Sequence, residues 1–371
     1  MTIIIQEITD KAQWNGFLTS QPRGHLLQSY EWGELNHYLG GHIYRLGAME
    51  NGRLIGAMML TGSRVPIPLP VPGVRFNWLY SSRGPTVEHP DSPALTSLIE
   101  SVQKITRAEH AVVLRLEPNI ADDDPHLDRW IEAYHDLGFQ TNPQAVHGRR
   151  SWVLDIRPGD EQLLANFKMT WRQNVRSAER KGVVIREAQS EVDFDAYYEL
   201  LKITSERDAF FIHNQDYHRE ILRQFSEKGD AVLYLAEHEG EALAAKMLIR
   251  FGDWCWDMFG ASSNNKRNLK PTYLLQYRCI QWARARGCSY FDFRTIPEIL
   301  EPGEEMWGVY EYKKGFGGFS RMNMPTQDYV YRPLIYNAWR KSVEIRRMHR
   351  HEERKKVELE RAARGKGENQ G

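Results

Sequence analysis

The sequence predicts an α/β protein built from two similar lobes. Three observations support this fold class: strands and helices alternate along the chain, the same order of elements occurs twice, and each half carries a hairpin of similar pattern. A chain of 371 residues is long enough for two domains of ordinary size. Its composition, 41% hydrophobic and 26% charged, can bury two cores and excludes a disordered or fibrous protein. We expect ligands to bind where the lobes meet.

The first half predicts a strand, two helices, a hairpin and two further strand–helix units. The hairpin turns at Asn51-Gly52, because both central residues of such a turn need a positive φ. Four prolines at alternate positions from Pro66 to Pro72 then make an extended loop that cannot be a central strand. The expected strands are residues 2–8, 41–49, 53–61, 74–80 and 111–116, and the expected helices follow Asp10, span 29–39 and 93–110, and run from Asp124 to Gly138.

The second half repeats this plan, with expected strands at 183–187, 231–237, 241–249, 254–259 and 289–294 and expected helices at 193–207, 216–228 and 271–286. Its hairpin can be laid over the first: Gly52-Arg-Leu-Ile-Gly-Ala-Met-Met-Leu60 matches Gly240-Glu-Ala-Leu-Ala-Ala-Lys-Met-Leu248. Two unrelated hairpins can match by coincidence. The repeated order of elements nevertheless favours a duplicated unit.

The C-terminal segment differs from both halves. Residues 333–348 carry apolar side chains at helical spacing and predict a helix whose first part packs on the body. Residues 349–371 are almost wholly charged and predict a solvated tail. A basic arm that touches RNA or anionic lipid is the alternative interpretation of that tail.

Composition narrows the class of protein further. The 49 Lys and Arg balance the 49 Asp and Glu, which argues against bulk nucleic-acid binding but leaves local basic patches open. Three cysteines without a C-x-x-C spacing exclude a disulfide scaffold or a cysteine-rich metal site. The N-terminus lacks the pattern of a secretory signal, and no apolar run approaches the ~20 residues that span a bilayer. We therefore expect a cytoplasmic protein.

Several familiar catalytic motifs are absent from the sequence. It contains no H-E-x-x-H, P-loop, G-x-S-x-G elbow or strand-linked G-x-G-x-x-G. The run Asp122-Asp123-Asp124 with His126 is a conceivable metal site, but helix capping explains it more simply, and we predict no metal.

Three stretches mix aromatic and basic residues and are the informative ones. Asn265-Lys-Arg-Asn-Leu-Lys270 precedes a helix that starts at Pro271, so free backbone N–H groups and cations coincide in a natural anion site. Phe167-Lys-Met-Thr-Trp-Arg-Gln-Asn-Val-Arg176 places several cations on one helix, which is also the pattern of an ordinary surface helix. Tyr310-Glu-Tyr-Lys-Lys-Gly-Phe-Gly-Gly318 combines two lysines with glycines that allow close backbone approach to a ligand.

Several blocks of the sequence resemble motifs of the Fem (FemABX) peptidyltransferases, in order, over roughly residues 5–335. The blocks are Gln28-Ser-Tyr-Glu-Trp-Gly-Glu-Leu35, Tyr80-Ser-Ser-Arg-Gly-Pro85, Trp171-Arg-Gln-Asn-Val-Arg176, Glu311-Tyr-Lys-Lys-Gly-Phe-Gly317, and the stretch from Gly260 through Lys270-Pro-Thr-Tyr to Asp292-Phe. Their agreement is specific for the family and not for the amino acid transferred.

The resemblance implies two tandem GNAT-like (acetyltransferase-like) lobes and a C-terminal helix. The first lobe is expected at 1–150 and is completed by about 320–348, the second at 151–319, and the tail at 349–371. No coiled-coil arm is expected in the second lobe, because residues 194–229 are used by two predicted helices. The implied reaction moves an amino acid from aminoacyl-tRNA to a side-chain amine in the stem peptide of a nucleotide- or lipid-linked peptidoglycan precursor, with no cofactor. Peripheral contact with the cytoplasmic face of the membrane is a further expectation.

The reaction needs positioning, a neutral amine and stabilisation of an oxyanion, because an aminoacyl ester is already activated. The family's aromatic–lysine pair matches Tyr312-Lys313, which makes Lys313 the candidate contact of the oxyanion or tRNA terminus, with Lys314 as its substitute. The family's carboxylate matches Glu117, which could accept the amine proton or hold the amine. A structural pairing of Glu117 with Arg115 or Arg83 is the alternative.

The sequence departs from the family at two substrate-binding positions. A lysine just past Trp32 and an arginine after the first helix of the second lobe are replaced by Asn36 and Asn214. Residues that could substitute are His37, Arg83, Arg207 and His213. The remaining expected contacts are Phe259 for the acceptor and Lys266, Arg267, Lys270, Lys314, Arg172 and Arg176 for tRNA.

Two other functions remain open at this point. One is an N-acetyltransferase that uses acetyl-CoA, but such enzymes hold the pyrophosphate with a Q/R-x-x-G-x-G/A loop, and residues 260–271 offer a single glycine. The other is a protein that binds tRNA or precursor without catalysis.

Overall fold

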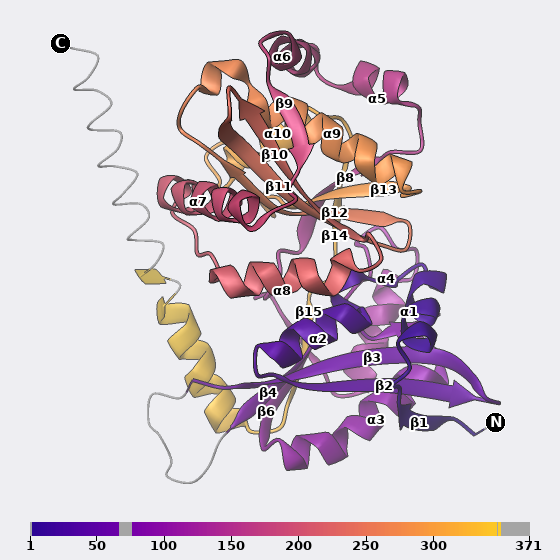
Figure 1. Cartoon of the computed structure of the whole chain (residues 1–371). Helices are drawn as coiled ribbons and strands as arrows, with labels where there is room; N and C mark the ends of the chain where they lie inside the picture. Colours follow the sequence, from indigo (N-terminus) through magenta and orange to yellow (C-terminus); the bar gives the residue numbers. More distant parts are fainter. Residues whose placement is uncertain (1, 67–75, 347, 350–371) are drawn as a thin grey trace.

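The computed structural model describes residues 2–66, 76–346, 348 and 349, and it contains two β-sheets (Figure 1). In sheet order, the first comprises β1 (Ile4–Glu7), β2 (His42–Glu50), β3 (Arg53–Arg64), β4 (Asn77–Arg83), β6 (Ala111–Pro118), β15 (Thr326–Val330) and β7 (Gln140–Asn142), with β5 (Thr86–Val87) paired to β3. The second comprises β14 (Phe319–Met322), β8 (Arg150–Asp155), β13 (Tyr290–Thr295), β12 (Trp254–Ser262), β11 (Glu241–Phe251), β10 (Ala231–His238) and β9 (Val184–Glu187). The α/β class is confirmed.

The two sheets repeat one arrangement. In each, a long antiparallel hairpin (β2–β3 and β10–β11) lies beside a parallel pair (β4–β6 and β12–β13). An antiparallel strand lies next to each parallel pair, β15 beside β6 and β8 beside β13. Strand β8 precedes the other strands of its sheet in the chain, whereas β15 returns to the first sheet from the far end of the chain. The repeated order supports the duplication inferred from the hairpins.

Helices lie around and between the sheets. They are α1 (Lys11–Ser20), α2 (Tyr30–Tyr38), α3 (Pro93–Ala108), α4 (Leu127–Asp136), α5 (Asp160–Asn166), α6 (Met169–Arg180), α7 (Glu191–Asp208), α8 (Gln215–Ser226), α9 (Pro271–Ala285) and α10 (Trp307–Lys314), with short 3₁₀ turns η1 (Leu26–Gln28) and η2 (Arg267–Leu269). Residues 333–346 form the expected C-terminal helix, which packs Tyr336 and Trp339 on Val112 and Val113. No helix in the described part of the chain is long and apolar enough to cross a membrane.

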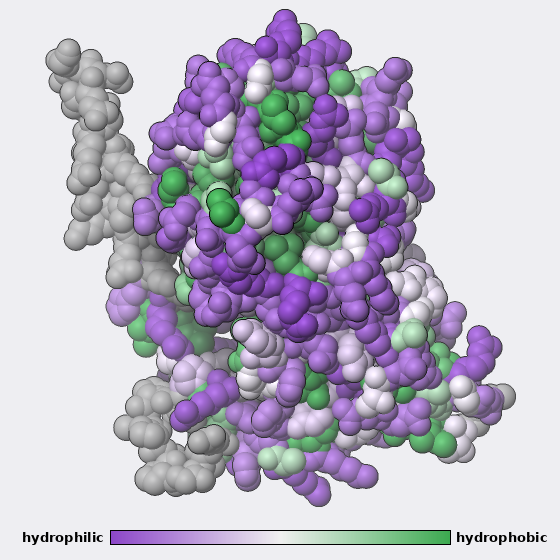
Figure 2. Space-filling view, in the orientation of Figure 1, coloured by the Kyte–Doolittle hydropathy of each residue, from purple (hydrophilic) through white to green (hydrophobic). Residues whose placement is uncertain are grey.

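One hydrophobic core joins the two halves. It contains Trp14, Leu35 and Met59 from the first half together with Ile221 and Trp256 from the second. In Figure 1, α2 and α8 lie against each other between the sheets, and their residues are in contact. The face shown in Figure 2 is largely hydrophilic with small hydrophobic areas, as expected when large apolar side chains are buried. The lobes are therefore held by shared packing.

Local details differ from the expectations in three places. Helix α4 begins at Leu127, because the Asp124 carboxylate accepts the N–H of His126 and forms a turn before the helix. The basic stretch Phe167–Arg176 forms one helix only from Met169, the start of α6, because Phe167 is extended and ends α5. Strand β4 continues to Arg83, past its expected end. Most of the proline loop, at 67–75, and the tail from 350 lie outside the described residues.

Candidate functional site

A cleft opens where two parallel strands of the second sheet separate. Strands β12 and β13 are paired from Trp254 and Tyr290 as far as Trp256 and Asp292. Beyond that point β12 has a bulge at Met258, while β13 continues beside β8 to Thr295. A bulge bends its strand and leaves a residue unpaired, so it lets the two strands diverge. In the first sheet, the corresponding β4 and β6 stay paired to Arg83 and Pro118.

A cavity of about 1780 Å³ adjoins this cleft. It collects side chains from α7, β11, β12, η2, α9 and α10. The sequence-predicted residues among its lining are Arg207, Phe259, Arg267, Lys270 and Tyr312. The structure therefore brings Tyr312 of the aromatic–lysine pair, the basic loop before α9 and two proposed acceptor contacts to a single cavity.

Lys313 lies at the end of α10, beside the diverging strands. Its Nζ donates a hydrogen bond to the Thr295 carbonyl oxygen at 2.7 Å, and its side chain is half-buried. Burial lowers the pKa of this ammonium to about 7, against the opposing attraction of the Asp257 carboxylate. Near neutral pH a large fraction of Lys313 is therefore an uncharged amine, which can accept a proton.

Tyr312 has a mainly packing environment. Its hydroxyl donates to the Thr272 carbonyl oxygen at 2.9 Å, and its ring meets Tyr273 and Phe316 edge-on. Burial raises the pKa of this phenol well above its ordinary value, so the hydroxyl stays protonated. Gly315, two residues beyond Lys313, packs against the Trp171 indole in a space too small for a side chain. The glycine thus serves internal packing, whereas the sequence suggested a close approach to a ligand.

Glu117 lies at the end of β6 and is 3% exposed. Its carboxylate accepts hydrogen bonds from the Tyr80 hydroxyl at 2.6 Å, from Thr326 at 3.3 Å, and from the backbone N–H groups of Val146 and His147. Arg115 instead forms a bidentate pair with Asp328, and Arg83 donates to a carbonyl. The alternative that Glu117 pairs with either arginine is therefore wrong.

The segment 146–148 lies between Glu117 and the Thr295 residue that binds Lys313. Two of its backbone N–H groups bind Glu117, and the Gly148 carbonyl accepts from Arg83 at 2.9 Å. Gly148 also lies so close to the Thr295 side chain that any Cβ there would collide with it. Thr295 in turn holds Lys313. Two of the three predicted catalytic residues, Glu117 and Lys313, therefore contact the same short junction between the lobes, and the third, Tyr312, is the neighbour of Lys313.

Positive charge gathers at this junction. Arg83 ends β4, Arg294 is the last but one residue of β13, and Arg321 belongs to β14. Arg83 and Arg294 both have a positive φ, which is costly for residues other than glycine. Burial lowers the pKa of Arg294 and Arg321, and repulsion by Arg83 adds to it. Burial, Arg83 and Arg294 lower the pKa of His147 to about 3. Asp292 is the nearby carboxylate that attracts both Arg294 and Arg321. This junction can hold an anion.

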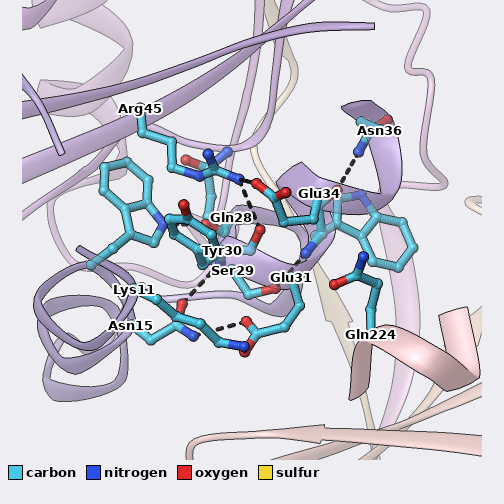
Figure 3. Close-up of polar contacts among 12 residues, drawn as sticks. Lys11, Asn15, Gln28, Ser29, Tyr30, Glu31, Glu34, Asn36, Arg45 and Gln224 are labelled. Carbon is cyan, nitrogen blue, oxygen red and sulfur yellow. Dashed lines mark hydrogen bonds and ion pairs between the residues drawn. The ribbon is translucent and has the colours of Figure 1, made fainter. Parts of the chain in front are cut away.

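The predicted contacts on α2 and α8 lie at the interface of the lobes. Trp32 is buried, His37 is exposed, and Asn36 donates its amide to the Trp32 carbonyl at 2.7 Å. Figure 3 shows Asn36 at one end of α2, with Gln224 of α8 facing the same region. Asn214 caps α8, since its side chain accepts the N–H of Tyr217. Each asparagine therefore forms a hydrogen bond within its own helix or at the start of it.

The remaining predicted cations are dispersed. Lys266 pairs with Glu239 and Glu241, Arg172 caps carbonyls at the end of α5, and Lys314 is exposed beside the Tyr310 ring. Arg176 is exposed on α6. Arg207 contacts Ser262 and Asn264 while lining the cavity. Of the predicted tRNA contacts, Arg267 and Lys270 therefore line the cavity and the others do not.

Sequence reasoning missed two charged residues at the cleft. Lys246 of β11 and Asp257 of β12 form an ion pair, and they are 9% and 8% exposed. A usable signal was present, because Asp257 is the single charge of the predicted strand 254–259 and Lys246 is the single charge within the apolar run 242–249. Thr295, Gly148, Arg294 and Arg321 were missed as well, since their importance depends on which strand ends face each other.

The fold is that of two tandem GNAT-like lobes. The tandem GNAT protein from the clavulanic acid biosynthesis pathway has a TM-score of 0.52 to this structure at 11% identity, over 88% of this chain and 98% of its own. More particularly, the chain belongs to the FemAB family, whose model matches residues 9–242 and 237–342.

Two relatives support this membership. The crystal structure of FemX has a TM-score of 0.81 at 22% identity, over 91% of this chain and 99% of that one. The lipid II:glycine glycyltransferase of Staphylococcus aureus (strain MRSA252) is 24% identical, over 87% of this chain and 92% of its own. The resemblance to the Fem peptidyltransferases is confirmed, and the chain is an acyl-transferring enzyme.

Proposed function

We propose that the protein transfers an amino acid from an aminoacyl-tRNA to a side-chain amine in the stem peptide of a peptidoglycan precursor. The observation that carries the proposal is Lys313, whose pKa of about 7 and position at the separated strands suit proton transfer to and from an amine. The glycyltransferase relatives, named for lipid II, support a lipid-linked precursor as the acceptor. A nucleotide-linked precursor is the second acceptor to test.

Lys313 alone can carry the proton through each step of the proposed reaction. The acceptor amine attacks the ester carbonyl, and its nitrogen becomes positively charged as the N–C bond forms. Neutral Lys313 then accepts a proton from that nitrogen. The resulting ammonium stabilises the oxyanion. It then gives the same proton to the departing ribose oxygen as the C–O bond breaks, which returns Lys313 to its neutral form. No covalent enzyme intermediate is required.

The two substrates are proposed to approach from different sides of the lysine. The 1780 Å³ cavity, with Arg267 and Lys270 in its lining, suits the aminoacylated end of a tRNA, because these cations can pair with phosphates. The basic junction at Arg83, Arg294 and Arg321 suits a negatively charged part of the acceptor. Glu117 stays a candidate catalytic residue, but its four hydrogen bonds favour a role in fixing the segment after Val146.

The test is a transfer assay with radiolabelled amino acids on several charged tRNAs, offered with lipid-linked and nucleotide-linked precursors and, separately, acetyl-CoA. The wild type should label a precursor amine. Lys313→Met should lose about 10²–10⁴-fold in rate, the usual contribution of a positioned acid–base group. Lys104→Met, the same change at an exposed lysine on α3, should keep most of the rate. Acetyl transfer without any aminoacyl transfer would overturn the proposal.

A further inference from the structure

A buried ion pair lies in the second sheet at the point where its strands separate. Lys246 and Asp257 belong to adjacent strands β11 and β12, and the Lys246 Nζ contacts the Asp257 Oδ2. Both residues are at least nine-tenths buried. Removing two charges from water is costly, and apolar residues of similar size often stabilise a core at least as well. The pair therefore calls for an explanation other than fold stability.

The pair borders both the cavity and the bulge. Asp257 immediately precedes the bulged Met258, and Lys246 is opposite Gly260 on β12. A Cβ at Gly260 would lie 3.4 Å from the Lys246 Nζ, and Lys246 itself lines the cavity with Tyr312. The pair is thus built into the wall next to Lys313 and is separate from the Thr295 contact that holds it.

Four charged groups from three strands act on the Lys313 amine. Asp257 and Asp292 favour its protonated form, and Lys246 and Arg294 disfavour it, in addition to the effect of burial. Asp257 has the largest effect among these charges, and Lys246 the next. Asp257 and Lys246 therefore pull the ionisation of Lys313 in opposite directions, from a fixed position in the sheet.

We propose that the Lys246–Asp257 pair is a positioning element that fixes the charge state of Lys313, so that its amine can both take up and release a proton near neutral pH. This inference rests on the function proposed for Lys313 and extends it to two residues that take no part in the proton transfers of the proposed reaction. A pair that merely stabilised the sheet would act on Lys313 only through loosening of its surroundings.

The two interpretations predict different signs. If the charges act on Lys313, Asp257→Asn lowers its pKa, because an attracting carboxylate is lost, and Lys246→Met raises it, because a repelling ammonium is lost. Each shift should be about one pH unit or more. If the pair is only structural, both variants admit water to the cleft, and both raise the pKa toward its ordinary value.

The titration can be measured without any turnover. Trace acetylation of the full-length protein between pH 5 and 10, followed by mass spectrometry, reports the reactivity of Lys313, and exposed Lys314 in the same peptide serves as the internal reference. Arg115→Met/Asp328→Asn removes another buried pair, in the first sheet, as a matched control for loss of stability. It should leave the Lys313 midpoint unchanged.

A downward shift in Asp257→Asn together with an upward shift in Lys246→Met would establish the inference. Shifts of the same sign in both, or no shift in either, would overturn it. If a single variant fails to fold, the double variant Lys246→Met/Asp257→Asn is measured instead. Its Lys313 midpoint should fall, because the attraction by Asp257 is the larger of the two effects that are removed. A rise or an unchanged midpoint would overturn the inference. These results stand whether or not the aminoacyl transfer is observed, so the two proposals fail separately.

Discussion

At the scale of single residues, the site combines one lysine of low pKa with an aromatic neighbour that is fixed by packing. Lys313 is near the cleft because its Nζ binds a carbonyl at the end of β13, and the adjacent Tyr312 keeps α10 in place through its ring and its bond to Thr272. Lys313 is therefore oriented by a backbone carbonyl and by packing, and no ionisable side chain is needed to hold it in place.

Tyr312 is expected to act through packing. In Tyr312→Phe, one hydrogen bond is lost and the ring is kept, so transfer should fall less than tenfold and stability by about 1 kcal/mol. Tyr312→Ala also removes the ring and should cost about 3–5 kcal/mol in stability. Urea unfolding and the transfer assay measure the two effects. A loss of transfer in Tyr312→Phe as large as that in Lys313→Met would show that the hydroxyl takes part in the chemistry.

At the scale of elements, Glu109 joins two strands of the first sheet to the end of α3. Its carboxylate accepts hydrogen bonds from Tyr44 and His42 of β2 and from Asn77 of β4. Burial opposes its charge, but these hydrogen bonds outweigh burial and lower the pKa of Glu109. The first sheet is thereby fixed at the end of β4 opposite Arg83 and the junction.

Glu109 should make stability depend on acid. Because its pKa is lower in the folded state, its stabilisation is complete above its ordinary pKa of 4.5 and is lost as the pH falls through the folded value. Glu109→Gln should cost about 2 kcal/mol at pH 7 and less at pH 3. Denaturant unfolding at both pH values gives the result, with exposed Glu100→Gln on α3 as the control. An equal cost at both pH values would contradict it.

The fold was more predictable than the site, and particular residues show why. Asn51-Gly52 and Pro93 mark their turn and helix through local chemistry, so both were found from the sequence. The Tyr312-Lys313 segment was found through its resemblance to the Fem family. The facing of Gly148 and Thr295 was not found, because it depends on the docking of two lobes distant in sequence. Lys246 and Asp257 needed the register of β11 and β12, which the lone charges alone do not give.

At the scale of the whole molecule, the shared core makes the two lobes a single packing unit. Helices α1 and α2 from the first half and α7 and α8 from the second contribute to one cluster of buried side chains. The basic junction and the Gly148–Thr295 contact lie on the same interface. The site is therefore sensitive to how the lobes are held together.

This arrangement predicts cooperative unfolding. Ile221→Ala, on α8, removes a fully buried side chain of the shared core and should cost about 2–5 kcal/mol. Hydrogen exchange should show the loss in both β-sheets, because the core contacts both. Val192→Ala on α7, where the side chain is 76% exposed, is the control and should have little effect. Loss of protection confined to the second sheet would show that the lobes unfold independently.

The most direct test of the account is the pH dependence of single-turnover transfer from a charged tRNA to the precursor amine. If neutral Lys313 accepts the proton, the wild-type rate should rise as pH increases through about 7 and then level off. Lys313→Met should be at least 100-fold slower and should lack this inflection. A Lys313→Met enzyme that transfers at the wild-type rate, with the same midpoint, would contradict the account.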